Sequence, residues 1–103
     1  MRLEEIQDFC RQSKIKWYKH AVERMQEREI SRADIKHCIM NGEIIEDYPD
    51  DFPHPSCLIF GYAVNNKIIH VVVSVDKDCI GVITAYFPNT DKFEKDLKTR
   101  KRC

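Results

Sequence analysis

The chain has 103 residues with 17 basic and 17 acidic side chains, so its formal net charge is zero. A composition that is 43% hydrophobic and 33% charged is typical of a soluble globular protein of one domain. Three glycines and four prolines are too few for a fibrous or disordered chain, and no apolar run approaches the ~18 residues of a membrane span. We therefore expect a single domain over residues 1–103 with no membrane partner.

The N-terminal part of the chain has the periodicity of helices. Apolar residues at helical spacing predict a short helix over residues 3–12 that buries Ile6 and Phe9. The stretch SKIKWY that follows is expected to be a connector, with Trp17 against the core. A second helix is predicted over residues 19–29, with one apolar stripe.

A third helix is predicted over residues 32–40, and its two ends are marked by sequence signals. Ser31 is a suitable N-cap, and Asp34 three residues later favours the positive end of the helix dipole. Gly42 is expected to close the helix in the left-handed conformation.

After residue 42 the pattern changes to that of extended strands joined by short turns. Because parallel strands need long crossovers, these short links predict an antiparallel β-meander, with the N-terminal helices packed on one face. A proline-rich loop separates the first two strands, and a weak helix or a tail follows Pro88. The four strands are expected at residues 43–48, 56–64, 68–75 and 80–87.

Alternation within the last two strands predicts which side chains share a face of the sheet. In the third strand, the all-apolar set should face the helices, which places His70 and Ser74 on the other face. In the fourth strand, Val82, Thr84 and Tyr86 are grouped on one side. We expect His70, Ser74, Thr84 and Tyr86 to lie on an open face that could hold a ligand.

The stretch KHAVERMQEREISRADI places an imidazole and two guanidiniums along one helix edge. His20, Arg24 and Arg28 follow the i, i+4, i+8 spacing of neighbours on a helix. Arginine binds phosphate oxygens with a planar fork, and histidine can move a proton near pH 7. The edge therefore suggests a site that processes phosphate esters.

Structural explanations compete with this catalytic hypothesis. Glutamates at positions 23, 27 and 29 could pair with the arginines in ordinary surface salt bridges. His70 could be a half-buried packing residue, and Tyr86 a packing aromatic at the end of a strand.

The cysteines indicate reduced thiols rather than a disulfide framework. Five of them are widely spaced without a CxxC pair, and MRLEEIQDF lacks the apolar segment of a signal peptide. A cytoplasmic protein is therefore expected. A zinc site of His54, Cys57, His70 and Cys79 has no characteristic ligand spacing, so neither a metal nor another cofactor is expected.

Charge is unevenly distributed along the chain. Residues 43–55 carry five acids and no Lys or Arg, whereas the basic tail, residues 92–103, carries six bases and two acids. Each run is either solvated surface or a local patch that contacts a partner.

HAVERMQEREIS, NGEIIEDYP, LIFGYAV, IHVVVSVD and VITAYFP occur in this order, and together they resemble the family called domain of unknown function 4258. The resemblance spans residues 18–88. It implies a RelE/ParE-like toxin fold, in which helices pack on a small antiparallel sheet. Related domains of the barnase, EndoU and colicin group are ribonucleases that need no metal and use the 2′-hydroxyl of RNA as the nucleophile.

By this resemblance, the catalytic residues are His20, Arg24, Arg28, His70 and Tyr86. His20 would be the general base or acid, and the arginines would hold the scissile phosphate. Tyr86 or His70 would be the second proton-transfer group or would stack on a base. RNA and an antitoxin protein are the implied partners.

Two other functions remain open from the sequence. One is a protein-interaction module that binds partners, or a second copy of itself, through charged segments or an exposed strand edge. The other is a nucleic-acid binder without catalysis, which uses the same arginines.

Overall fold

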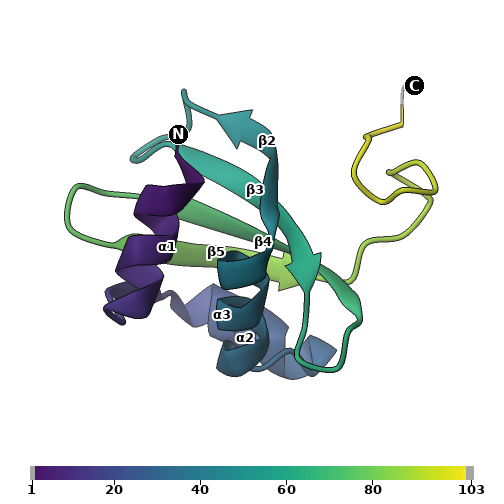
Figure 1. Ribbon diagram of the computed structural model, residues 1–103, viewed down its shortest axis with the longest axis horizontal. Coiled ribbons are helices and arrows are strands. Elements are labelled where there is room, and N and C mark those ends of the chain that lie inside the picture. The colour runs from purple at the N-terminus through teal and green to yellow at the C-terminus, as the bar shows by residue number, and fades with distance from the viewer. Residues whose placement is uncertain (1, 102–103) are drawn as a thin grey trace.

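The computed structural model describes residues 2–101, which form three helices and one mixed sheet of five strands (Figure 1). The predicted α+β class is confirmed. The helices are α1 (Leu3–Arg11), α2 (Lys19–Arg28) and α3 (Arg32–Asn41). The strands are β1 (Ile15–Trp17), β2 (Glu43–Tyr48), β3 (Ser56–Tyr62), β4 (Ile68–Val75) and β5 (Ile80–Tyr86).

The sheet has the order β1-β5-β4-β3-β2. Strands β2 to β5 form the predicted antiparallel meander. The prediction of four antiparallel strands is wrong in one respect, because the connector SKIKWY contains β1, which pairs in parallel with β5. Three residues are too few to show the alternation of a strand, and the pairing of Ile15 with Ile80 depends on a distant segment.

Helix α3 begins with the predicted cap. Ser31 Oγ accepts a hydrogen bond from the Asp34 amide at 3.0 Å, and the Ser31 amide donates to Asp34 Oδ2 at 2.9 Å. The predicted left-handed Gly42 is wrong, because its φ of −103° is extended. Glycine is required there for space, since a Cβ atom would lie 2.4 Å from the carbonyl oxygens of Cys38 and Phe60.

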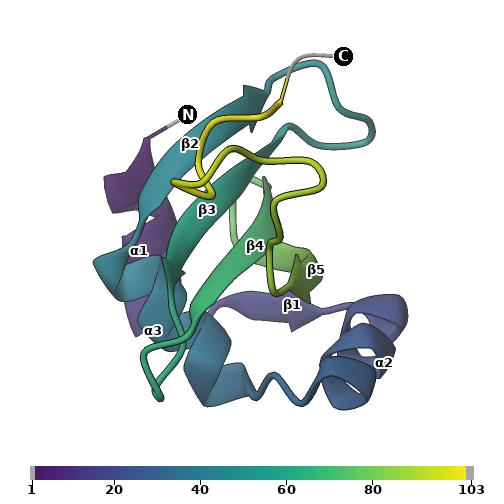
Figure 2. The ribbon, with the colours of Figure 1, turned by 90° about the vertical axis from the view of Figure 1, so that its right-hand side faces the viewer.

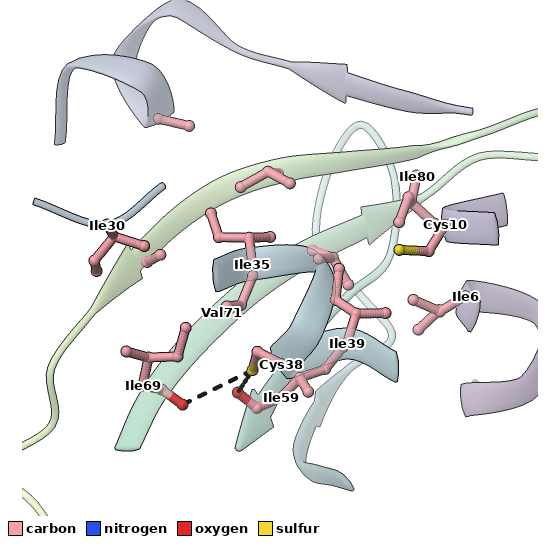
Figure 3. Close-up of a cluster of buried hydrophobic side chains, with 14 of the residues drawn as sticks. Ile6, Cys10, Ile30, Ile35, Cys38, Ile39, Ile59, Ile69, Val71 and Ile80 are labelled. Carbon is pink, nitrogen blue, oxygen red and sulfur yellow. Dashed lines mark hydrogen bonds between the residues drawn. The ribbon is translucent and has the colours of Figure 1, made fainter. Parts of the chain in front are cut away.

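Helices α1 and α3 cover one face of the sheet, and α2 packs along β5 (Figure 1). Their apolar side chains meet those of β3, β4 and β5 in one buried cluster (Figure 3). Within it, Cys38 Sγ lies 4.0 and 3.9 Å from the carbonyl oxygens of Ile59 and Ile69. The labelled members in Figure 3 are Ile6, Cys10, Ile30, Ile35, Cys38, Ile39, Ile59, Ile69, Val71 and Ile80.

A bulge in β5 changes which of its residues face the helices. Val72 pairs with Thr84, but Val73 pairs with Val82, so Ile83 is an extra residue in the ladder. Val82 therefore joins the helix-side core, and its predicted grouping with Thr84 and Tyr86 is wrong. Strict alternation cannot anticipate a bulge, since one inserted residue reverses every later assignment.

The opposite face of the sheet is not open, contrary to the prediction. The C-terminal segment, residues 89–101, lies across β3 and β4 on this face without forming a helix (Figure 2). Its backbone closes on itself through a bridge between Phe93 and Arg100. Phe93 is 2% exposed, and beneath it His70 is fully buried. Apolar packing therefore attaches this segment to the sheet.

Candidate active site

A cavity of about 540 Å³ lies where three parts of the chain meet: the end of α2, the end of β5 and the C-terminal segment. Cavities of this size hold single small molecules or parts of larger ligands. Its lining combines cations, one carboxylate and aromatic rings. These residues are Arg28, Tyr86, Phe87, Pro88, Asn89, Asp91, Lys92, Phe93 and Arg100.

Arg28 is the last residue of α2, and its side chain reaches β5. Its Nη1 atom donates to the Ala85 carbonyl oxygen at 2.7 Å and lies 3.4 Å from Thr84 Oγ1. Both contacts use Nη1, so the Nη2 and Nε donors remain for a ligand in the cavity. Helix α2 thus delivers a guanidinium whose position is fixed by the sheet.

Arg100 supplies a second fixed guanidinium from the C-terminal segment. Its Nε and Nη2 atoms donate to the two carboxylate oxygens of Glu46, each at 3.0 Å. The guanidinium carbon lies 4.8 Å from the centre of the Phe93 ring. Two-point pairing with Glu46, a further interaction with the Tyr48 side chain and stacking on Phe93 restrict the guanidinium, which still forms part of the cavity lining.

The cavity is electrically positive. Its lining contains three cations, Arg28, Lys92 and Arg100, and one carboxylate, Asp91. Glu46 lies behind Arg100 and neutralises part of that charge. The net charge around the cavity is still positive, which favours an anionic ligand.

Tyr86 connects the cavity to His70. The two residues face each other on β5 and β4, and the Tyr86 hydroxyl lies 3.3 Å from His70 Nδ1. On the other side of the imidazole, Nε2 lies 2.7 Å from the Leu97 carbonyl oxygen. A carbonyl can only accept, so Nε2 carries the proton, and in the neutral ring Nδ1 accepts from the Tyr86 hydroxyl.

Burial and charge act on the acid–base properties of this pair. Burial lowers the pKa of His70 below its ordinary value, although the Leu97 carbonyl and nearby Glu46 oppose the shift. Burial also raises the pKa of Tyr86, against the effect of Arg100 and Arg28. Near neutral pH the pair therefore consists of a neutral imidazole and a protonated phenol.

The structure separates the five predicted catalytic residues into two groups. Arg28 and Tyr86 line the cavity, and His70 supports Tyr86 from behind. His20 and Arg24 lie outside the lining. The His20 side chain is 87% exposed, with Nδ1 3.8 Å from Glu23, and Arg24 donates to Glu27 at 3.0 Å. For Arg24, the surface salt bridge offered as the structural explanation is present.

The four residues of the zinc alternative are not brought together. Cys57 belongs to the helix-side core, whereas His70 lies on the opposite face of β4. His54 Nε2 lies 3.8 Å from Asp76, in the loops at the other end of the sheet. Among residues 2–101, no three His, Cys, Asp or Glu side chains are grouped closely enough to hold a metal ion. Cys103 lies outside the described residues.

The acidic run and the basic tail, which the sequence presents as separate patches, contact each other. Arg100 pairs with Glu46, and Lys98 Nζ lies 3.3 Å from Glu43. The tail is described as far as residue 101. Two of the five basic side chains in residues 92–101 are therefore paired with the acidic run.

Sequence reasoning missed Arg100, Lys92 and two aromatic residues of the lining, Phe87 and Phe93. Phe93 and Leu97 are spaced four apart in a charged segment, a pattern that could have indicated packing against the domain. No local pattern identifies Arg100, because its position depends on Glu46 in β2.

Comparison with known proteins gives a family for this chain but no activity. Residues 17–87 match the family described as domain of unknown function (DUF4258), and the chain belongs to this family. Neither the curated proteins nor the solved structures contain a match. The matched region covers α2 to β5 and ends before the C-terminal segment.

Within residues 2–101, no helix has both the length and the apolar composition needed to cross a membrane.

Proposed function

We propose that the protein is a metal-independent endoribonuclease of the toxin type, and that the cavity holds the scissile phosphate of RNA. The observation that carries the proposal is the Tyr86 hydroxyl, which is hydrogen-bonded to a buried neutral imidazole and lines a cavity with two fixed guanidiniums. Arg28 and Arg100 approach from different elements and can contact one phosphate from two sides.

The reaction would begin with attack of the 2′-hydroxyl oxygen on the adjacent phosphorus. Tyr86 takes the 2′-hydroxyl proton while its own proton moves to His70 Nδ1. The imidazolium that forms keeps its Nε2–H bond to the Leu97 carbonyl. As the new oxygen–phosphorus bond forms, the bond to the 5′ oxygen breaks, and that oxygen takes a proton from Lys92. The products are a cyclic phosphate and a 5′-hydroxyl.

The proposal includes a RelE/ParE-like fold, supported by helices on one face of an antiparallel meander. It also places the protein in the cytoplasm, where four of its cysteines, Cys10, Cys38, Cys57 and Cys79, would stay as the free thiols described here. An antitoxin protein would be its natural partner.

The test is cleavage of mixed single-stranded RNA by the purified chain in EDTA. Replacement of Tyr86 by phenylalanine removes only the hydroxyl, and we expect the rate to fall by about 10²-fold or more. The matched control is Tyr62→Phe, which removes the hydroxyl of an exposed tyrosine outside the cavity. His20→Ala, at a side chain outside the lining, should also retain activity.

Other results would favour the alternative functions. RNA that is bound in a salt-dependent manner but stays intact would indicate a nucleic-acid binder. A protein partner bound equally by the parent chain and by Tyr86→Phe would indicate an interaction module. Equal cleavage by the parent and Tyr86→Phe proteins would contradict the proposed role of this hydroxyl.

A further inference from the structure

We infer that the cavity is a subsite for one unpaired nucleotide, with a base stacked on Phe87 and its phosphate between Arg28 and Arg100. The inference deepens the proposed function, on which it rests for the identity of the polymer. It adds a specific requirement, namely that a base contributes to binding as well as a phosphate.

The lining of the cavity has two chemically different parts. The cations Arg28, Lys92 and Arg100 suit a phosphate, whereas Phe87 and Pro88 provide an apolar wall at the end of β5. A ligand that is only an inorganic anion would leave that wall without a partner. A nucleotide carries both a charged group and a flat aromatic surface, so it matches both parts.

The Phe87 ring is accessible to a ligand. Phe87 is 40% exposed and follows Tyr86, the half-buried last residue of β5. The Lys67 ammonium lies 5.8 Å from the ring centre, outside the cavity lining, so one more cation lies near this ring. An exposed aromatic ring in a positively charged groove is the usual platform for an unpaired base.

The size of the cavity favours a single-stranded substrate. A volume of about 540 Å³ suits one small ligand, so a base pair with its two backbones would not enter. The base must therefore be unpaired and turned out of any stack before it reaches Phe87. Loops and ends of RNA offer such bases, whereas continuous duplex does not.

The experiment compares the binding of three probes by NMR or calorimetry: adenosine 3′-monophosphate, inorganic phosphate and adenosine. The full chain should bind the nucleotide at least about 10-fold more tightly than phosphate, because stacking adds to the contacts of the guanidiniums. Phe87→Leu should remove most of this preference and leave phosphate binding unchanged. Phe87→Tyr keeps an aromatic ring and should retain the preference.

The matched control is Phe52→Leu, because Phe52 is 95% exposed and lies outside the cavity. It should bind all three probes like the parent chain. Equal affinity for the nucleotide and for phosphate would overturn the inference, even if RNA were cleaved. A nucleotide preference that depends on Phe87 would support the subsite, even if RNA stayed intact and the proposed cleavage failed.

Discussion

His70 is a fully buried histidine that contacts a different element on each side of its ring. The centre of the imidazole ring lies 4.7 Å from the ring centre of Phe93 and 5.3 Å from that of Tyr86. Both ring nitrogens have hydrogen-bond partners. Enclosure of this kind disfavours the charged imidazolium, so the pKa of His70 lies below its ordinary value. Folding is therefore linked to the protonation of one residue.

The sign of this linkage gives a prediction for stability. As pH falls below 6.5, the unfolded chain gains a proton on His70 that the folded chain does not accept until its lower folded pKa is reached. The stability that neutral His70 contributes is thus complete above pH 6.5. It declines as the pH falls from 6.5 toward the lower pKa of the folded state. We expect His70→Gln to flatten the dependence of unfolding free energy on pH in this window, measured by urea titration.

His20→Gln is the matched control, because it makes the same substitution at a side chain that is 87% exposed. The parent's pH dependence should remain in this variant. The loss of a buried, hydrogen-bonded ring will also lower stability at every pH, by about 1–3 kcal/mol. Because this loss is the same at every pH, it does not change the slope of unfolding free energy against pH. An unchanged slope in His70→Gln would show that His70 is not the linked group.

Among the elements, the C-terminal segment contributes most to the candidate site although it forms neither a helix nor a strand. An Asp96-centred turn, in which Asp96 Oδ1 accepts from the amides of Lys98 and Thr99, places Leu97 at a φ of 58°. That left-handed conformation is costly for a residue with a side chain. It directs the Leu97 carbonyl to His70, so the strained residue is the one that fixes the tautomer.

Removal of the aromatic contact should loosen this element and change the titration of the histidine. We expect Phe93→Ala to raise the pKa of His70 toward 6.5, because burial is the largest cause of its depression. Loss of the Leu97 hydrogen bond would act in the opposite direction, but it is the smaller contribution. NMR titration of the imidazole protons measures the shift.

The control for this experiment is Phe52→Ala, a substitution at a ring that is 95% exposed. It should leave the titration of His70 unchanged. A His70 pKa that stays depressed in Phe93→Ala would show that the sheet alone excludes water from this ring.

The elements that could be predicted from sequence are those whose signals are local. The cap at Ser31, the periodicity of α2 and the short turns of the meander each depend on residues close together in the chain. The pairing of β1, the bulge at Ile83 and the docking of Phe93 depend on contacts between distant segments. For the same reason, the site was predicted only in part.

His20 illustrates this limit. Its spacing with Arg24 and Arg28 is correct for one helix edge, yet only Arg28, at the end of α2, reaches the cavity. Helical periodicity states which residues share an edge, but it does not state how far along the sheet that edge extends.

At the scale of the whole molecule, one apolar cluster connects residues from α1 to β5. Cys10, Cys38 and Cys57 belong to it, and burial raises the pKa of both Cys38 and Cys57 to about 12. At pH 8 a thiol with a pKa of about 12 is roughly 10³-fold less ionised than a free cysteine, whose pKa is near 8.5. They can react only when the core opens, so they report on global unfolding.

We predict that a chain with Cys79→Ser and Cys103→Ser reacts slowly with a thiol reagent under native conditions. Its labelling rate should rise with urea in parallel with unfolding followed by circular dichroism, because the core opens as a unit. The parent chain, in which Cys79 is partly exposed, is the control and should show an additional fast phase. Fast labelling of a core cysteine in the double variant would contradict the prediction, because it would show that part of the core opens without global unfolding.

The family match ends at residue 87, and the segment that follows supplies Lys92, Arg100 and the Leu97 carbonyl. Relatives with other sequences after this position would keep α2, α3 and strands β2 to β5 but exchange two of the three cations. Ligand preference could then diversify through a short appended stretch, while the helix-side core stayed constant. Because the same stretch covers His70 with Phe93, each such change would also alter the stability of the sheet beneath it.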